Sequence, residues 1–366
     1  MLLNDLKKVS RIGIIGAGWI VRKFYLPYLQ SSSSIDEISL FDSNMDQIHL
    51  DSNEKLKIAT DALSIFTDPE VDLVIIATPN CFHFKYIELG IVHHKHVICE
   101  KPICMTHEEG EKIQKLLEEK QSESKIFPAL PCRYRTDIEH LKMLLKEEAI
   151  GKIYKFHAKW WRTNGIPNSS WFLNKETSGG GVLIDLGSHL IDLMLWLLDF
   201  PDPVDVQGAL EAVFINDQNK KASWHNKNEA VSLSNVEDNA SVMLRFEHFY
   251  GLVDLCWAGS YHRDEAVIEF HGKEGYIRLT TLFGFSQETD IIEARLEIYT
   301  QGSLKVHKIP ISNRLAPYHA MLDAYLQDIG CNLKESVNAE FLKDSLKTIG
   351  VIDRLYKLSE GKIINI

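Results

Sequence analysis

The sequence predicts an α/β domain built on a doubly wound parallel sheet, followed by an α+β domain with an open, mainly antiparallel sheet. As far as residue 127, short apolar runs alternate with helical patterns, which is typical of parallel strands linked by helices. Beyond it, strand-like segments follow one another directly, which favours an antiparallel sheet. At 366 residues, the chain also exceeds what one hydrophobic core usually sustains. We therefore expect one domain over residues 1–127 and a second over residues 128–366.

The first strand and the turn after it indicate a dinucleotide site. Residues 12–15 are apolar and lead into a Gly-Ala-Gly turn, after which a helical pattern begins. Gly16 would permit a tight turn, and Gly18 would let the backbone approach a pyrophosphate at the helix N-terminus. Val21 stands where a third glycine is usual, so we expect the helix to be pushed slightly away from the strand. The candidate cofactor contacts here are Gly16, Ala17, Gly18, Trp19 and Ile20.

The next strand, residues 37–41, predicts the ribose contact. It ends in Asp42, close to the roughly 20-residue offset expected of the carboxylate that binds an adenosine ribose. Ser43 and Asn44 follow, and because neither can pair with a 2′-phosphate as an arginine would, NAD is favoured over NADP. The alternative is a strand-ending aspartate in an ordinary turn. With the glycine turn, Asp42 predicts a sheet of the Rossmann type.

Two further strands end in polar residues, in the order that a doubly wound sheet requires. Residues 71–80 are apolar on both faces, as a covered parallel strand should be, and residues 95–102 follow. Because ligands of open α/β sheets bind outside the carboxyl ends of the strands, both ends belong at the cofactor. Pro102 would hold Lys101 in one direction, although a solvated loop lysine is the alternative. The candidate contacts are Thr78, Pro79, Asn80, His83, Glu100 and Lys101.

An apolar stretch over residues 179–199 carries a stripe of polar side chains. On one helix, Asp185, His189, Asp192 and Trp196 would fall on the same face. Burying an uncompensated carboxylate or imidazole costs on the order of several kcal/mol, so these groups are either paired internally or face a cleft. A cleft makes Asp185 and His189 candidate acid–base groups. The alternative is a core histidine hydrogen-bonded to an aspartate one turn away.

In this order and spacing, the GAG turn, the ATPN segment, the EKP triplet and the GGGVLIDLGSH segment resemble the Gfo/Idh/MocA family, which includes glucose–fructose oxidoreductase and inositol dehydrogenase. The resemblance spans essentially the whole chain. It implies an NAD-dependent oxidoreductase that transfers a hydride between the cofactor and a secondary alcohol or ketone of a sugar, inositol or related polyol. It also implies that Lys101, Asp185 and His189 meet at the nicotinamide and are catalytic.

The chemistry of alcohol oxidation gives these three residues separate roles. A base must touch the hydroxyl while its carbon faces the nicotinamide, and a histidine, which ordinarily titrates near pH 6.5, suits this task for His189. Asp185 would orient the imidazole and stabilise its charged form. Lys101 would stabilise the developing alkoxide electrostatically.

Polar and aromatic residues near the glycine-rich segment are candidates for the substrate pocket. Tryptophan faces suit sugar rings, and arginine can read hydroxyl groups, although core packing is the alternative for any single tryptophan. The candidate substrate contacts are Arg133, Arg162, Trp171, Asp185 and His189.

Alternating apolar residues predict the strands of the second domain, and a helix at residues 339–359 could pack back on the first domain. In the family, one face of this sheet is bare and commonly packs against another subunit. An apolar face of this size would otherwise be an exposed patch, so we expect a homodimer or homotetramer. The expected strands are residues 152–162, 204–215, 239–248, 253–257, 266–270, 275–280, 296–299 and 304–309.

Composition limits the partners. A net charge of −11 argues against nucleic acid, whose backbone demands clustered Lys and Arg. With no apolar run of about 18 residues and no signal-peptide pattern, we expect no membrane contact and a cytoplasmic location. The 6 cysteines contain no C-x-x-C pair and are expected to be free thiols. The adjacent histidines within residues 93–96 rarely converge on one ion, so we expect no metal.

Two other functions stay open. Some relatives of the same fold use NAD transiently to cleave glycosidic bonds, and such an enzyme would release a sugar without net NADH. A regulatory protein could instead bind the dinucleotide as a signal. That protein would not need Lys101 together with Asp185 and His189, which favours an enzyme.

Overall fold

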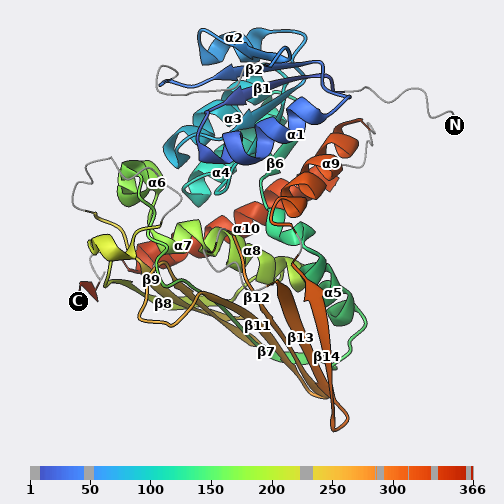
Figure 1. The fold of residues 1–366 in the computed structure, drawn as a ribbon, viewed down its shortest axis with the longest axis vertical. Coiled ribbons are helices and arrows are strands. Elements are labelled where there is room, and N and C mark those ends of the chain that lie inside the picture. The colour runs from blue at the N-terminus through green and yellow to red at the C-terminus, as the bar shows by residue number, and fades with distance from the viewer. Residues whose placement is uncertain are drawn as a thin grey trace, which may run out of the picture. The chain divides into compact units, whose positions relative to one another are not determined.

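The chain forms two compact units in the computed structural model (Figure 1). The first comprises Met1–Pro131 and Tyr318–Leu346, and the second comprises Cys132–Pro317 and Lys347–Ile366. The predicted boundary after residue 127 lies close to this division. The prediction gave residues 128–366 to the second domain, with a C-terminal helix that could pack back on the first, and Tyr318–Leu346 cluster with the first unit. The structure describes residues 9–44, 53–222, 234–284, 286, 292–311, 313–330, 337–359 and 364–365.

The first unit contains a sheet of six parallel strands in the order β3-β2-β1-β4-β5-β6. The chain starts in the middle of this sheet, runs outward to β3 and then returns to β4 on the other side of β1. The predicted doubly wound, Rossmann-type sheet is therefore confirmed, with its switch point between β1 and β4. The strands are β1 (Arg11–Ile15), β2 (Glu37–Phe41), β3 (Leu56–Ile58), β4 (Leu73–Ile76), β5 (His96–Cys99) and β6 (Ile126–Pro128).

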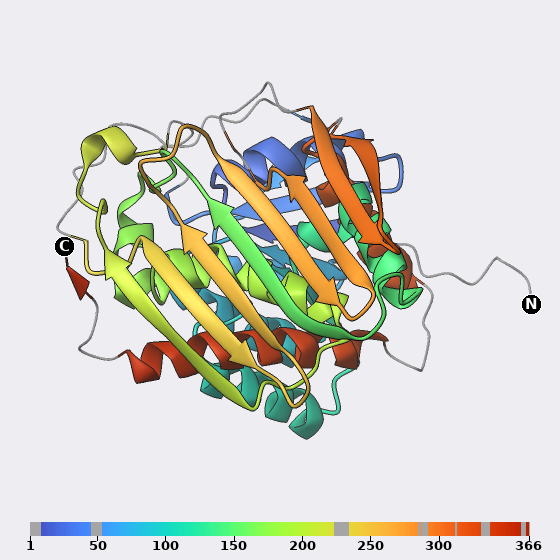
Figure 2. The same cartoon turned by 90° about the horizontal axis from the view of Figure 1, so that it is seen from below.

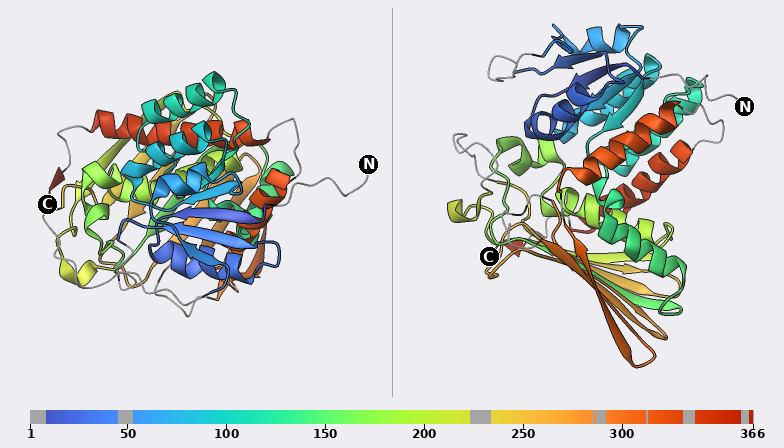
Figure 3. Two further views of the ribbon diagram at one scale, coloured as in Figure 1. Left: turned by 90° about the horizontal axis from the view of Figure 1, so that it is seen from above. Right: turned by 45° about the vertical axis from the view of Figure 1, so that its right-hand side comes forward.

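Helices cover both faces of this sheet, as the left panel of Figure 3 shows from above. The segment Tyr318–Leu346 is attached to the sheet edge at β6. There the ring of Tyr325 stacks on Phe127 with centroids 4.5 Å apart, and its hydroxyl donates to the Pro128 carbonyl at 2.7 Å. The helices are α1 (Leu26–Ser31), α2 (Ala62–Thr67), α3 (His83–Val92), α4 (His107–Glu119), α9 (Ala316–Gly330) and the first part of α10 (Val337–Leu358).

The helix after the glycine turn begins at Trp19 and winds as a π-helix over Val21–Tyr25 before it continues as α1. The Leu26 N–H donates to the Val21 carbonyl, and the Val21 side chain is fully buried. The wide helical turn therefore starts at Val21, the residue that stands in place of the third glycine, and the expected separation of helix and strand stays a prediction.

The second unit contains a sheet of nine strands in the order β14-β13-β12-β11-β7-β10-β9-β8-β15. Its pairs are antiparallel except β7–β10 and β8–β15, and every expected strand overlaps an observed one, so the predicted sheet is confirmed. The strands are β7 (Ile153–Trp161), β8 (Asp205–Ala212), β9 (Asn239–Arg245), β10 (Tyr250–Cys256), β11 (Glu265–Gly272), β12 (Gly275–Thr281), β13 (Glu293–Thr300), β14 (Ser303–Pro310) and β15 (Ile364–Asn365).

Helices pack on one face of this sheet and bury a large apolar core there. They are α5 (Thr136–Lys146), α6 (Lys175–Ser178), α7 (Val182–Asp185), α8 (Gly187–Leu197) and the end of α10, joined by short 3₁₀ helices at Pro131–Tyr134, Ser170–Leu173 and Gln218–Lys220.

The prediction of a single helix over residues 179–199 is wrong, because the structure has two helical segments there. The helix is broken after α7, and the segments Lys175–Asp185 and Gly187–Leu197 meet at 45°. The break coincides with Gly187, a poor helix former, where a side-chain Cβ would lie 3.2 Å from Leu255 of β10. Within the described ranges no single helix is long and apolar enough to cross a bilayer, although this bent pair passes by length and composition; Gly187–Leu197 is almost entirely buried in the unit.

The other face of the nine-stranded sheet is bare, as Figure 2 shows from below. The expectation of an apolar face is wrong, because charged pairs run across it. His157 contacts Asp254 at 2.7 Å, and Lys159 contacts Glu265 at 2.7 Å. Strand alternation explains this: every second residue of β7 enters the core, and the intervening ones carry the charges.

Candidate functional site

The glycine turn and Asp42 lie together at the carboxyl ends of β1 and β2. Gly16 has a φ of 99°, and a Cβ there would overlap the Ala77 carbonyl, so only glycine fits. Asp42 Oδ2 accepts a hydrogen bond from the Ala17 N–H at 2.7 Å. Nothing lies within 4 Å of a Cβ built on Gly18, so open space adjoins the backbone there.

A buried histidine joins the ends of β4 and β5. The ring of His83, at the start of α3, contacts the Pro102 carbonyl through Nδ1 at 2.7 Å and the Thr78 carbonyl through Nε2 at 2.9 Å. Burial lowers the pKa of His83, and the Lys101 charge lowers it further. His83 therefore fixes the two strand ends, which is a structural role beside the predicted cofactor edge.

Glu100 and Lys101 follow β5 directly. The Tyr25 hydroxyl donates to Glu100 Oε1 at 2.8 Å, and Tyr25 is fully buried. Burial raises the pKa of Glu100, while the hydrogen bond from Tyr25 and the Lys101 ammonium lower it. Lys101 itself is half-buried and precedes a cis peptide bond to Pro102.

These groups fit a dinucleotide. Open space adjoins the backbone at Gly18, where a pyrophosphate would approach, and Asp42 lies at the turn, where a ribose carboxylate is required. Thr78 Oγ1 is buried without a hydrogen-bond partner among the described residues, so it has a donor and acceptor available for a ligand at this edge.

In the second unit, Asp185 lies at the end of α7 beside the carboxyl ends of two parallel strands, β7 and β10. The indole Nε1 of Trp257, which follows β10, donates to Asp185 Oδ2 at 2.8 Å. Arg162, which follows β7, is buried, and its charge is balanced by Asp185 and Asp264, while burial lowers the pKa of its guanidinium. The structure thus brings two predicted residues, Asp185 and Arg162, together.

His189 lies on the first turn of α8 and is 9% exposed. Its ring is 6.0 Å from the ring of Trp160, measured between centroids. The Arg162 guanidinium lies over the same Trp160 ring, at 5.1 Å. Trp160 therefore connects His189 with Arg162, and the action of Asp185 on His189 stays a prediction.

The polar stripe continues into a separate structural pair. Asp192 accepts from Arg133 Nε at 2.8 Å and from Arg133 Nη2 at 2.6 Å, and both side chains are buried. This bidentate pair gives Arg133 a structural partner, so a role in substrate binding is a weaker interpretation for it. Trp171 is half-buried, with its ring centroid 3.8 Å from that of Phe172.

The glycine run before α7 exists because other groups approach its backbone. A Cβ on Gly180 would overlap the Tyr356 hydroxyl, and one on Gly181 would overlap the Glu237 carbonyl. Glu237 Oε1 accepts from the N–H groups of Gly181 and Leu183, both at 3.0 Å, and from the Tyr356 hydroxyl at 2.8 Å. This buried carboxyl holds the start of the helix that carries Asp185.

Sequence reasoning missed Tyr25, Glu237, Trp257 and Tyr356. Each acts on a residue far away in the chain, and none belongs to a motif. The nearest signal is an acidic pair, Glu237 and Asp238, directly before a strand that otherwise alternates apolar and polar residues.

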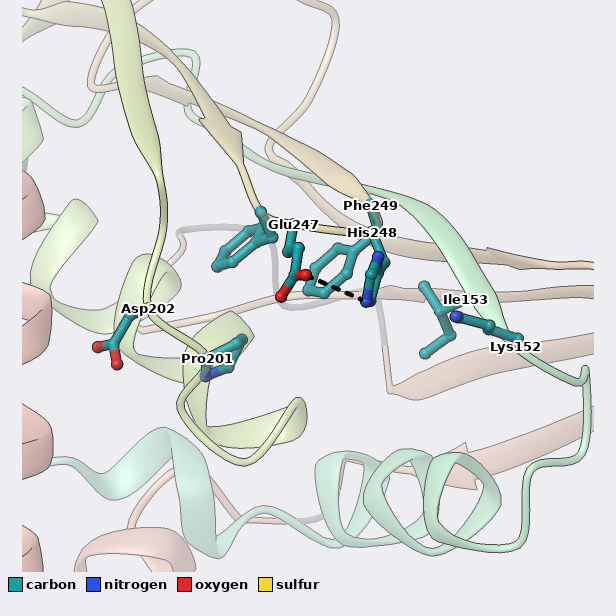
Figure 4. A pocket seen from close by; sticks show the side chains of 8 residues that line it. Lys152, Ile153, Pro201, Asp202, Glu247, His248 and Phe249 are labelled. Carbon is teal, nitrogen blue, oxygen red and sulfur yellow. Dashed lines mark ion pairs between the residues drawn. The ribbon is translucent and has the colours of Figure 1, made fainter.

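A hollow of about 520 Å³ lies elsewhere in the second unit, at the turn between β9 and β10 (Figure 4). Phe246 and Phe249 form an apolar wall, and Glu247 and His248 form an exposed ion pair at 3.7 Å. It contains none of the predicted site residues. In the described part of the chain, no three His, Cys, Asp or Glu side chains are grouped as a metal ion requires, and five cysteines are free thiols, Cys331 being outside that part.

Two family models match the chain. Residues 10–125 match an oxidoreductase family with an NAD-binding Rossmann fold, and residues 138–278 match the GFO/IDH/MocA C-terminal domain.

Curated proteins and solved structures agree with this. The chain is 29% identical over 308 residues to a putative UDP-kanosamine synthase oxidoreductase subunit of Amycolatopsis mediterranei, covering 82% of this chain and 83% of that protein. It is 29% identical over 199 residues to D-glucoside 3-dehydrogenase of Escherichia coli. That alignment covers 52% of this chain and 54% of the relative. A 3-ketoreductase from Actinomadura kijaniata, in complex with NADP and TDP-benzene, has a TM-score of 0.71 at 16% identity with 98% of both chains covered, which shows a shared fold.

Proposed function

The chain belongs to the Gfo/Idh/MocA family of oxidoreductases, and we propose that it oxidises a secondary hydroxyl of a sugar, inositol or related polyol, with NAD as the hydride acceptor. One observation carries this proposal beyond the family. Asp185 and Arg162 lie together beside the ends of two parallel strands, and the Trp160 ring contacts both Arg162 and His189, which supports an acid–base pair that can meet a hydroxyl-bearing ligand here.

The chain's own residues divide the chemistry as follows. His189 accepts the proton of the substrate hydroxyl, and Asp185 stabilises the resulting imidazolium. Lys101, fixed at the end of β5, stabilises negative charge that develops on the same oxygen. When bound, the nicotinamide supplies the hydride-accepting carbon.

We propose NAD as the preferred cofactor because Asp42 would repel a 2′-phosphate. Its carboxylate is held at the glycine turn by the Ala17 N–H, and Asn44 N–H donates to its second oxygen at 2.8 Å. We expect kcat/KM to be higher with NAD than with NADP, and Asp42→Ser to narrow that ratio. A higher kcat/KM with NADP in the unaltered enzyme would contradict the assignment.

The hydroxyl at carbon 3 of a hexopyranoside is the first substrate to test, because both D-glucoside 3-dehydrogenase and the 3-ketoreductase are named for that carbon. UDP-linked hexoses belong in the same panel, since the relative with the longest alignment reported above carries UDP in its name.

Absorbance at 340 nm with NAD and this panel tests the function directly. We expect Lys101→Ala and His189→Ala each to reduce kcat roughly 100-fold or more, because each removes a group that acts in the transition state. Release of an aglycone without net NADH would support the glycoside-cleaving alternative. Binding of NAD without turnover of any panel member would support the regulatory alternative.

We also propose that the protein forms a homodimer or homotetramer through the bare face of the nine-stranded sheet. Pairs such as Arg278–Glu269, at 3.3 Å, give that face both signs of charge, as a self-complementary interface needs. Light scattering at micromolar concentration should give a dimer or tetramer mass, and Arg278→Glu should weaken the assembly. A monomer mass for the unaltered protein would overturn this proposal.

A further inference from the structure

Asp185 accepts a hydrogen bond from an indole that water cannot reach. Trp257 Nε1 lies 2.8 Å from Asp185 Oδ2, and Trp257 is fully buried. An indole has one N–H donor and no acceptor, so this side chain can only donate to the carboxylate. Hydrogen bonds of this kind favour the charged form of a carboxyl group.

The indole is placed by the sheet. Trp257 directly follows β10, and its backbone is held on both sides. The backbone N–H of Trp257 donates to the Asp238 carbonyl at 2.9 Å, and the backbone carbonyl of Trp257 accepts from the Gly165 N–H at 2.8 Å. A Cβ on Gly165 would lie only 2.8 Å from that carbonyl, so the backbones approach closely. A donor fixed in this way can hold its acceptor in one orientation.

A positive charge lies on the neighbouring strand end. The backbone N–H of Arg162 donates to the Cys256 carbonyl at 3.0 Å. Arg162, which follows β7, and Trp257, which follows β10, are therefore side by side. The buried guanidinium of Arg162 is balanced by Asp185 and Asp264. The Asp264 carboxylate has other partners, because it also accepts hydrogen bonds from the backbone N–H and the hydroxyl of Thr163.

We propose that Trp257 is a positioning residue for the acid–base pair: its indole N–H fixes the Asp185 carboxylate in the charged form, with Arg162 as the supporting cation. This inference rests on the roles proposed above for Asp185 and His189. It also reassigns Arg162 from contacting the substrate to holding Asp185.

Kinetics of Trp257→Phe test the positioning role, because phenylalanine keeps an aromatic ring and removes the N–H. We expect kcat to fall roughly 10- to 100-fold while KM changes little. We also expect the acid limb of the activity profile to move to higher pH, since the carboxylate loses a donor. Trp196→Phe, on α8, is the matched control and should leave both unchanged. An unaltered pH profile in Trp257→Phe, or an equal loss in both variants, would overturn the proposal.

A measurement without turnover keeps the proposal testable if that variant does not fold or the proposed substrates are wrong. The 7 tryptophans give indole N–H signals in a ¹⁵N NMR spectrum of the full chain. We expect one slowly exchanging signal to shift strongly in Asp185→Asn, and no such shift in the control Asp36→Asn, which changes an exposed aspartate of the first unit. If no indole signal responds to Asp185→Asn, the bond does not exist in solution. If hydride transfer fails with every substrate but this signal shifts, only the proposed function is overturned.

Discussion

In each unit a glutamate carboxyl accepts a hydrogen bond from a tyrosine hydroxyl; Glu237 is fully buried and Glu100 is half-buried. In the first unit Tyr25 donates to Glu100, and in the second Tyr356 donates to Glu237, both at 2.8 Å. Burial raises the pKa of both carboxyl groups. The same pair of side chains therefore recurs in two unrelated sheets, each time beside residues to which we assign function.

The surroundings of the two carboxyls differ, and the difference separates two uses of a glutamate carboxyl. Glu100 has the Lys101 ammonium beside it, so its charge is coupled to a side chain for which we propose a catalytic role. Glu237 instead accepts hydrogen bonds from the N–H groups of Gly181 and Leu183, so its charge is coupled to the backbone of a turn. The first arrangement tunes an electrostatic environment, and the second fixes geometry.

The largest effect is expected from filling the turn that Glu237 holds. Gly181→Ala would place a methyl group against the Glu237 carbonyl, and we expect a loss of about 3 kcal/mol in the free energy of unfolding. Urea unfolding measures it. The matched change in the first unit is Gly18→Ala, where open space predicts almost no loss of stability but weaker NAD binding. Equal stability of the two variants would contradict the proposal that Glu237 fixes the geometry of this turn.

A smaller effect is expected from the tyrosines. Tyr356→Phe and Tyr25→Phe each remove a hydrogen-bond donor to a glutamate carboxyl, which we expect to cost about 1–3 kcal/mol in the free energy of unfolding, measured with urea. Only Tyr25→Phe should also change the pH dependence of kcat, because Glu100 adjoins Lys101. A matching change in the kcat profile of Tyr356→Phe would contradict the separation of roles.

The smallest effect is a pH slope. Because burial raises the folded-state pKa of Glu237, the folded state binds the proton more tightly, and stability is lost as pH rises from the ordinary glutamate value of 4.5 toward the raised pKa. Glutamine does not titrate, so across that window wild type should lose up to about 1.4 kcal/mol per pH unit relative to Glu237→Gln.

The control for this slope is Glu247→Gln, whose side chain is 82% exposed and should give no pH-dependent difference. Stability curves of wild type and Glu237→Gln that run parallel from pH 4.5 to 8 would show that Glu237 is not perturbed in the folded state.

Local sequence patterns were sufficient to predict most of the strands and the class of both sheets. Period-2 alternation placed β9, and both-face apolar runs placed β4, because side-chain periodicity follows directly from which faces are buried. Strand-end motifs likewise found the turn at Gly16 and its contact with Asp42, since the carboxyl ends of parallel strands share one sheet edge.

Residue pairs that are distant in the sequence were beyond such patterns. Trp257 lies 72 positions from Asp185, and no periodicity marks it as that carboxylate's donor. The sequence predicts Arg133 only as a substrate contact, because no pattern links it to Asp192, which lies 59 positions away. The break before Gly187 was hidden for the same reason, because Leu255, which packs there, belongs to a later strand.

The first unit has a further consequence for how the chain is made. Its sheet edge at β6 is covered by α9, where the Tyr325 ring stacks on Phe127 and the Lys125 ammonium lies 3.1 Å from the Asp328 carboxylate. During synthesis, this edge must leave the ribosome long before its cover has been translated. The nascent nucleotide-binding half therefore spends most of elongation with Phe127 unprotected, and a fragment that stops at residue 131 should need the later segment supplied as a separate peptide before it folds.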